Sequence, residues 1–333
     1  MNTQKNTGKF IISLDYELMW GVRDHATPQS YGANIAGVHL ALPKLLEMFT
    51  NYNIHATFST VGFLFFENKE ELLSNLPSLI PEYSDKNLSP YHANYFQKNL
   101  ENSYPQDSYH YGLHLIKLIQ KTPNQEIGTH TFSHYYCLEP GQNAATFKAD
   151  IEAAVKVAAM RGIELKSIIF PRNQINKEYL KICQDAGITS YRNNPVSWIY
   201  RARNTESESI IRRGCRLADA YINLSGHNCY SDAHITAEFP VNIPGSSFLR
   251  PYSGKLKLLD GLRLARIKNS MTHAAKNNLM YHLWWHPHNF GINQQQNFSF
   301  LKKILEHYLL LNKKYSFTSY TMTELANKFT TNK

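Results

Sequence analysis

The stretch Phe10-Ile11-Ile12-Ser13-Leu14-Asp15-Tyr16-Glu17 joins an apolar run of strand length to two carboxylates. Further apolar runs of this kind recur along the chain, at 54–60, 126–128, 166–170, 281–285 and 315–320. Stretches with helical periodicity lie between them, at 37–50, 63–76, 144–160, 176–186 and 294–311. Such alternation predicts βα units around a parallel sheet. Because about seven units fit the chain, the predicted fold class is α/β, an irregular seven-stranded (β/α) barrel.

Two segments interrupt this alternation. Residues 77–111 are rich in Tyr, Asn, Ser and Pro, and residues 193–251 hold a cluster of arginines. We expect both to be loop insertions, and in a barrel the loops that follow the strands build the functional site. The sequence has no internal repeat and no long linker, so a single catalytic domain over residues 1–333 is expected.

Composition and charge narrow the range of functions. The chain has 333 residues, of which 43% are apolar and 18% charged, as in globular proteins. Its net charge of +9 favours anionic partners, namely phosphorylated small molecules, lipid head groups or nucleic acid. The four cysteines are scattered without a Cys-x-x-Cys pair, which favours a reducing compartment. Residues 1–9 do not resemble a secretory signal, and the longest uncharged run, 54–66, is too short to span a bilayer, so we expect a cytoplasmic protein.

Two histidines four positions apart follow the strand-like run at 126–128. In the segment His130-Thr131-Phe132-Ser133-His134, both imidazoles could reach one divalent ion if the segment starts a helix. Two ligands do not complete a site, so the interpretation depends on a third.

The carboxylates of Asp15 and Glu17 are the first candidates for that third ligand. Alternate residues of an extended chain share a face, so both groups lie on one side. Near a metal, one could ligate the ion while the other takes a proton from bound water. A solvated strand end explains the same pair.

The late segment from Tyr281 to Gly291 holds three histidines and two tryptophans. His282, Trp284 and His286 have the same strand parity, and the proline at 287 ends the strand directly after His286. These residues could be ordinary core or surface side chains. The strand end beside them favours the rim of an active site.

Residues 166–170 form another strand-like run, and it is followed by Pro171-Arg172-Asn173. An arginine at a strand end can hold a carboxylate by a two-pronged hydrogen bond. A surface arginine explains Arg172 equally well.

These four segments, taken in chain order, resemble the polysaccharide deacetylases of carbohydrate esterase family four. That family carries an Asp-Asp or Asp-x-Asp after the first strand, a His-x-x-x-His, an arginine-containing turn and a late strand ending in histidine. The resemblance spans roughly residues 10 to 325. It departs from the family where Glu17 replaces an Asp and where Phe-Pro-Arg-Asn-Gln replaces Arg-x-Pro-Tyr.

The resemblance implies specific roles for individual residues. It makes Asp15 the general base, Arg172 the residue that orients it, His286 the general acid, and Glu17, His130 and His134 the ligands of a divalent metal, with Zn²⁺ the first choice. His288 is the alternative acid. We further expect Trp285, His288 and Asn173 to contact the substrate.

The expected activity is metal-dependent hydrolysis of an N-acyl group, with N-acetyl the first choice, on an amino sugar. A cytoplasmic enzyme would act on a nucleotide-linked or lipid-linked intermediate of surface polysaccharide biosynthesis. The alternatives are a non-catalytic carbohydrate-binding or assembly protein, or another C–N hydrolase that removes a formyl group or opens a ring. A zinc protease is disfavoured because the motif lacks the glutamate of His-Glu-x-x-His, and no motif indicates nucleic acid.

Two basic segments bear on partners. Five arginines of the second insertion could bind a diphosphate or form a solvated basic loop, namely Arg201, Arg203, Arg212, Arg213 and Arg216. The segment Lys255–Lys268 interleaves leucines with basic residues. It fits either peripheral contact with an anionic membrane at its inner face or a barrel helix packed by its leucines. The sequence leaves the oligomeric state open.

Overall fold

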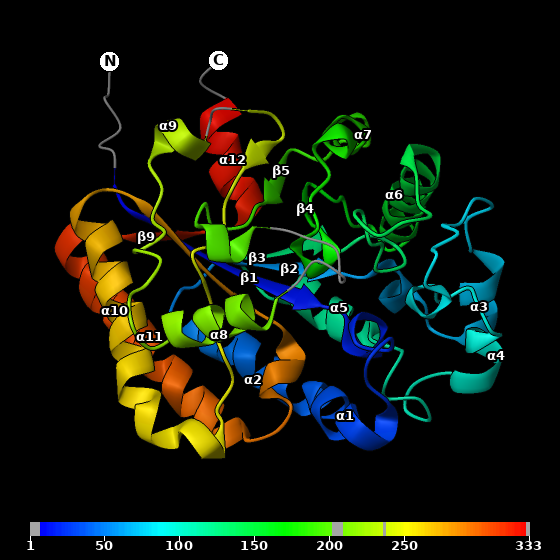
Figure 1. Ribbon diagram of the computed structural model, residues 1–333, viewed down its shortest axis with the longest axis horizontal. Helices are drawn as coiled ribbons and strands as arrows, with labels where there is room; N and C mark the ends of the chain where they lie inside the picture. The colour runs from blue at the N-terminus through cyan, green and yellow to red at the C-terminus, as the bar shows by residue number, and fades with distance from the viewer. Residues whose placement is uncertain (1–6, 202–208, 236–237, 331–333) are drawn as a thin grey trace.

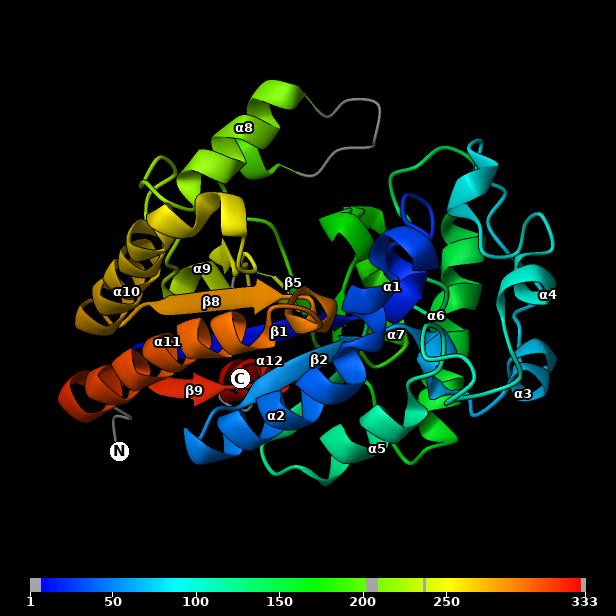
Figure 2. The same ribbon diagram turned by 90° about the horizontal axis from the view of Figure 1, so that it is seen from below.

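Strand β1 (Lys9–Tyr16) is buried along its whole length and has three neighbouring strands. It belongs to a sheet of nine strands in the computed structural model, which describes residues 7–201, 209–235 and 238–330. Every paired strand in this sheet is parallel, and Figure 2 shows β8, β1, β2 and β9 pointing the same way. Burial on both faces explains why β1 reads as a nearly continuous apolar run. The other strands are β2 (Ala56–Thr60), β3 (Gln125–Thr129), β4 (Ser167–Ile169), β5 (Ser190–Arg192), β6 (Val241–Asn242), β7 (Ser247–Phe248), β8 (Met280–Trp285) and β9 (Thr318–Tyr320).

The sheet curls into a barrel because one extended segment closes it. Strands run in the order β6-β5-β4-β3-β2-β1-β8-β7, so β6 and β7 are at the two ends of the path. They are nevertheless neighbours in the chain. Between them, the amide of Ile243 donates to Tyr191 on β5 at 2.9 Å, and the amide of Ser246 donates to His282 on β8 at 2.8 Å. The segment 241–248 therefore fills the gap between β5 and β8.

This arrangement confirms the predicted α/β barrel and refines its strand count. The structure has nine strands where seven were expected. Strands β6 and β7 are two parts of the closing segment, and β9 pairs only with the first residues of β1, Lys9 to Ile11. The second predicted insertion, 193–251, thus contains part of the barrel wall as well as loops.

Helices cover the outside of the barrel, with α2, α10 and α11 along β1 and β8 (Figure 2) and α6 and α7 on the side of β4 (Figure 1). Their bounds are α1 (Pro28–Ala36), α2 (Val38–Asn51), α3 (Lys69–Ser74), α4 (Tyr95–Asn99), α5 (Leu113–Lys121), α6 (Ala144–Ala159), α7 (Leu180–Asp185), α8 (Ile210–Asp219), α9 (Asp232–Ile235), α10 (Asp260–Lys276), α11 (Gln294–Tyr315) and α12 (Met322–Thr330). Among the described residues, no helix is long and apolar enough to cross a membrane.

Two glycines let the loop after β8 pack closely against the junction of α1 and α2. A Cβ on Gly37 would lie 2.0 Å from the carbonyl oxygen of Gly291, and a Cβ on Gly291 would lie 1.9 Å from that of Asn34. Only glycine permits such contacts between backbones. The loop carries the histidines at 286 and 288, so this packing helps to fix their position.

Candidate metal centre and active site

Glu17, His130 and His134 form a buried cluster at the carboxyl ends of β1 and β3. Their ligand atoms all lie within 4.8 Å of one another. Oε2 of Glu17 is 3.3 Å from Nε2 of His130 and 3.2 Å from Nε2 of His134. Two atoms bound to one ion at about 2.1 Å with tetrahedral angles lie roughly 3.4 Å apart. The spacing and the two-nitrogen, one-oxygen donor set therefore fit a divalent metal such as zinc.

The protonation of the two imidazoles also suits metal binding. Nδ1 of His130 lies 2.8 Å from the carbonyl oxygen of Ile169, which can only accept, so Nδ1 carries the proton and Nε2 presents its lone pair to Glu17. Burial lowers the pKa of His134, which favours the neutral form that a metal requires. Burial alone would raise the pKa of Glu17, but the imidazoles of His286, His130 and His134 hold it well below its usual value.

The segment with the two histidines is a turn, where the sequence predicted a helix start. It follows β3 directly, and both Thr131 and His134 have positive φ angles, 65° and 59°. Asp150 on α6 holds the turn, because its carboxylate accepts from the amides of Phe132 at 2.7 Å and Ser133 at 3.1 Å. The two rings still converge, with centroids 5.1 Å apart.

Glu17 is placed by a tight turn at the end of β1. The strand ends at Tyr16, and a 3₁₀ turn, Leu18–Gly21, begins directly after Glu17. A Cβ on Gly21 would lie 2.0 Å from the carboxyl carbon of Glu17 and 2.3 Å from each of its oxygens. The glycine at 21 therefore leaves the space that the Glu17 carboxylate occupies.

Asp15 is held by Arg192, a residue that the sequence reasoning missed. Nη1 and Nη2 of Arg192 donate to the two carboxylate oxygens of Asp15 at 2.8 and 2.7 Å, and both side chains are buried. Burial by itself would raise the pKa of Asp15, but the Arg192 guanidinium, His130 and His286 hold it below its usual value. Asp15 is thus an ionised carboxylate with a fixed orientation.

Arg172 does not have the role that was predicted for it. The strand β4 ends at Ile169, and Arg172 follows in a turn with a φ angle of 52°. Its guanidinium pairs with Asp24, lies 3.9 Å from Glu139 and stacks over the ring of Tyr136 at 4.4 Å. The positive φ turns this side chain toward Asp24, and the arginine that binds Asp15 comes from the next strand, β5.

Asn173 forms a hydrogen bond with Arg192, the arginine that pairs with Asp15. Its Oδ1 accepts from Nη2 of Arg192 at 2.9 Å, and the residue lines the cavity in front of Asp15. Asn173 was expected to contact the substrate. It lies where it could do so, and it also fixes the arginine.

A second chain of hydrogen bonds connects Arg192 to β8. Nη1 of Arg192 donates to Oγ of Ser13 at 2.9 Å, and Nε2 of His282 lies 2.8 Å from the same oxygen. Nδ1 of His282 lies 3.2 Å from the carbonyl oxygen of Ile243 in the closing segment. Burial lowers the pKa of His282 to about 3, so its imidazole is neutral and accepts from the Ser13 hydroxyl.

His286 and His288 stack side by side over the carboxylates, with centroids 4.8 Å apart. Nε2 of His286 lies 3.7 Å from Asp15 Oδ2 and 3.7 Å from Glu17 Oε1, and its side chain is 24% exposed. His288 is buried, with Nδ1 3.9 Å from Glu17 Oε1. Burial, followed by the neighbouring His286, lowers the pKa of His288 to about 3. Of the two histidines, His286 is the one that faces both Asp15 and the solvent.

Trp285 was expected to contact the substrate, and this is wrong. It is fully buried in the hydrophobic core, where it packs against Phe49 and Phe290. Trp284 instead lines the cavity in front of Asp15. Phe248 packs against it, with the ring centroids 4.7 Å apart. Strand parity is the cause, since Trp284 shares the face of His286 and Trp285 has the opposite one.

The arginines of the second insertion divide into different groups. Arg201 and Arg216 line a cavity beside the site, and Arg213 is exposed on α8. Arg212 is buried and donates to the carbonyls of Trp198 and Arg201 at 2.9 and 3.0 Å. Arg203 lies outside the described residues.

The sequence profile of the polysaccharide deacetylase family matches residues 36–191. No curated protein matches the chain. Among solved structures, a putative polysaccharide deacetylase from Mycobacterium smegmatis matches with a TM-score of 0.60 and 11% identity, over 100% of this chain and 93% of that one. A probable polysaccharide deacetylase from Pseudomonas aeruginosa PAO1 matches with a TM-score of 0.53 and 9% identity, over 96% and 89%. Puue allantoinase matches with a TM-score of 0.53 and 8% identity, over 97% of this chain and 90% of that one.

At these identities the structural matches establish the fold, and the sequence profile adds a family match over part of the chain. The profile covers β2 to β5, and thus both histidines of the cluster and the turn that holds Arg172. The elements outside it, β1 and β8, bring Asp15, Glu17 and His286 to the same place. Over residues 36–191 the chain is therefore similar in sequence to the polysaccharide deacetylase family.

Proposed function

We propose that the protein removes an N-acyl group, with N-acetyl the first choice, from an amino sugar in a metal-dependent hydrolysis. The observation that carries the proposal is the convergence of a candidate metal cluster, an oriented carboxylate and an imidazole within one cavity. Glu17, His130 and His134 would hold the divalent ion, with zinc the first choice for two nitrogens and one oxygen. When bound, such an ion polarises an amide carbonyl and acidifies a water molecule.

Asp15 is the proposed general base. Its carboxylate is ionised, and its orientation is fixed because each oxygen accepts a hydrogen bond from Arg192. A base that is already oriented toward the attacking water needs no reorganisation during proton transfer. Arg192, Asn173 and Ser13 act on the reaction only through Asp15, so they are positioning residues.

His286 is the proposed general acid. Its Nε2 lies 3.7 Å from a carboxylate oxygen of Asp15 and 3.7 Å from one of Glu17, and its partial exposure lets it exchange protons with solvent. A protonated imidazole there can donate to the departing sugar nitrogen. His288 is the weaker candidate, because a group with a pKa of about 3 is rarely protonated near neutral pH.

The cavity in front of these groups is large enough for a saccharide. Its volume is about 620 Å³, and Phe248 and Trp284 form one of its walls. Aromatic faces of this kind stack on the apolar faces of sugar rings. Tyr31 and His25 also line the cavity and can offer polar contacts to hydroxyl groups.

The test is release of acetate from a panel of N-acetylated amino sugars by the zinc-loaded protein. Asp15→Asn should reduce turnover by about 10²- to 10⁴-fold. Asp185→Asn changes an exposed carboxylate that pairs with Lys181, and it serves as the matched control. Bound zinc without acetate release from any member of the panel would favour a non-catalytic carbohydrate-binding protein. Release of formate or a ring-opened product from a corresponding substrate would favour a different C–N hydrolase.

A further inference from the structure

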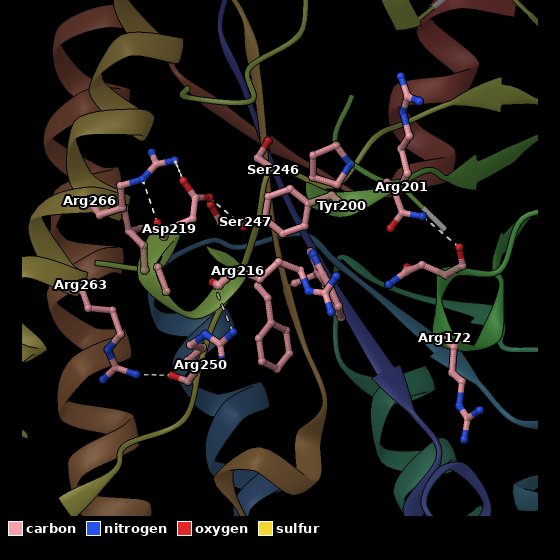
Figure 3. A pocket seen from close by; sticks show the side chains of 17 residues that line it. Arg172, Tyr200, Arg201, Arg216, Asp219, Ser246, Ser247, Arg250, Arg263 and Arg266 are labelled. Carbon is pink, nitrogen blue, oxygen red and sulfur yellow. Dashed lines mark hydrogen bonds and ion pairs between the residues drawn. The ribbon is translucent and has the colours of Figure 1, made fainter. Parts of the chain in front are cut away.

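A second cavity, of about 270 Å³, lies beside the first and shares a wall with it. Four residues line both cavities, namely Arg172, Asn173, Phe248 and Trp284. The remaining lining comes from the segment around α8, from residues 246–250 and from α10 (Figure 3). A ligand whose sugar ring rests on Trp284 can therefore extend into the second cavity without leaving the protein surface.

Arginine is the commonest residue in the lining of this second cavity. Among its described lining residues are six arginines and one aspartate, namely Arg172, Arg201, Arg216, Arg250, Arg263, Arg266 and Asp219. Figure 3 shows Arg263 and Arg266 on the side of the cavity opposite Arg172 and Arg201, with Arg216 and Arg250 between them.

Carboxylates offset the charge of only some of these arginines: Asp24 pairs with Arg172, and Asp260 lies 2.9 Å from Arg263. Asp219 accepts from the hydroxyl of Tyr200 at 2.7 Å and from the amides of Leu224 and Ser225 at 2.9 and 2.8 Å. Arg266 lies 3.6 Å from it and offsets its charge. The carboxylate is thus engaged in holding the loop after α8.

Arg250 is a half-buried arginine of this cavity. Its Nη2 donates to the carbonyl oxygen of Arg216 at 3.3 Å, and no described carboxylate pairs with it. Arg263 holds its backbone, because Nη1 of Arg263 donates to the carbonyls of Arg250 and Pro251. Burial lowers the pKa of Arg250, and the positive charge of Arg216 lowers it further. An anion that binds beside a half-buried cation with no paired carboxylate stabilises it electrostatically.

In helix α10 two arginines are buried and a leucine is exposed, whereas a surface helix usually buries its leucines and exposes its arginines. Arg263 and Arg266 are buried, whereas Leu258, just before the helix, is 91% exposed and Leu262 is 50% exposed. The interpretation of 255–268 as a helix packed by its leucines therefore does not hold at these two positions. Burying a guanidinium group is costly unless it is paired, and here each has a carboxylate neighbour, Asp260 at 2.9 Å from Arg263 and Asp219 at 3.6 Å from Arg266. The helix thus contributes paired cations, and not leucines, to the lining of the cavity.

We infer that this arginine cavity binds the phosphoryl group that links the amino sugar to its carrier. The inference rests on the proposed function and adds the substrate class, a phosphate- or diphosphate-linked amino sugar. Guanidinium groups bind phosphate oxygens through paired, charge-assisted hydrogen bonds. The sugar would occupy the catalytic cavity against Trp284, and the phosphate would lie near Arg250. Nucleotide and polyprenyl carriers share this chemistry, and the substrates used below distinguish them.

The first experiment measures binding of inorganic pyrophosphate by calorimetry, using protein freed of metal with a chelator and then dialysed. Removing the metal excludes binding of pyrophosphate to the ion. Arg250→Gln should weaken binding by on the order of 10- to 100-fold, the loss of one hydrogen-bonded charge pair. Arg250→Lys keeps the charge and should bind with intermediate affinity. Arg213→Gln removes an exposed arginine from α8 that does not line the cavity, and it should bind pyrophosphate as the native protein does.

The second experiment compares the KM values of three substrates, each with an N-acetylglucosamine group. They are its methyl glycoside, its uridine diphosphate conjugate and its conjugate with a short polyprenyl diphosphate. Arg250→Gln should raise KM on the order of 10-fold or more for a diphosphate substrate and leave that of the glycoside unchanged. The carrier with the lower KM in the native protein is the one that the site prefers.

The two proposals can fail separately. Pyrophosphate binding that depends on Arg250, without hydrolysis of any substrate, would retain the anion site and remove the deacetylase function. Hydrolysis of the methyl glycoside without pyrophosphate binding would retain the function and overturn the anion site. Equal loss of pyrophosphate binding in Arg213→Gln and Arg250→Gln would also overturn it, because the affinity would then reflect overall charge.

Discussion

Replacing Arg192 tests whether this residue, and not Arg172, controls the proposed catalytic carboxylate. In Arg192→Gln, Asp15 loses two charge-assisted hydrogen bonds of 2.8 and 2.7 Å while it stays buried. Breaking a buried ion pair in this way costs about 3–5 kcal/mol. The cost falls on the ionised form of Asp15, because burial alone raises the pKa of a carboxyl group.

The sign of the pH effect follows from that cost. In the native protein the pKa of Asp15 lies below its ordinary value, so the base stays ionised down to acidic pH. In Arg192→Gln its pKa should rise, and the acid limb of kcat/KM should move upward by roughly two to four pH units, because about 3–5 kcal/mol is divided by 1.36 kcal/mol per unit.

The assay is the pH profile of acetate release, with Arg172→Gln as the matched variant. Arg172 pairs with Asp24, so its replacement should leave the acid limb in place even if turnover falls. An acid limb that moves in Arg172→Gln and stays fixed in a folded Arg192→Gln protein would refute the assignment of the two arginines.

Two further predictions concern metal affinity and stability. In Gly21→Ala the new Cβ would lie 2.0 Å from the carboxyl carbon of Glu17, so zinc affinity measured by competition with a chelator should fall on the order of 10- to 100-fold. Gly214→Ala, where nothing lies within 4 Å, should bind zinc normally, and unchanged affinity in Gly21→Ala would contradict the placement of Glu17. His282 has a pKa of about 3 in the folded protein, below its unfolded value of about 6.5, so its contribution is complete above pH 6.5 and is lost as pH falls. Denaturant unfolding should show a loss of about 1.4 kcal/mol per pH unit below 6.5 that is missing in His282→Gln, and equal slopes in the two proteins would count against a buried neutral imidazole.

The parts of the site that could be predicted from sequence are those carried by local spacing. Glu17, His130 and His134 lie at the ends of apolar strands long enough to recognise, and parallel strands bring their carboxyl ends to one edge. Parity placed His286 on the same face as Trp284. The same alternation of side chains along the strand places Trp285 on the opposite face, toward the core.

The parts that could not be predicted depend on short strands and backbone geometry. Strand β5 has only three residues, Ser190–Arg192, and it lies at the border of an arginine-rich segment, so no apolar run marks it. The one available signal was a polar residue at a strand end, the pattern that drew attention to Arg172. The positive φ of Arg172 is set by packing and leaves no trace in the spacing. The closing segment 241–248 could not be recognised from the sequence either, because β6 and β7 have only two residues each.

The inferred phosphate site shows how charge and topology combine. Two interpretations of the arginines in the second insertion are compatible with the sequence, a diphosphate site and a solvated loop. The fold brings Arg216 beside Arg250, Arg263 and Arg266, which come from later segments. A cluster assembled across such distances in the chain is visible only after folding.

The central claim is that Glu17, His130 and His134 hold a divalent metal ion beside Asp15. Crystals of protein grown in zinc-replete medium, measured above and below the zinc absorption edge, test it most directly. We expect one anomalous peak within about 2.0–2.2 Å of the Glu17 carboxylate and of Nε2 of both histidines. The absence of a peak between these three residues at neutral pH, in protein that is folded and zinc-replete, would contradict it.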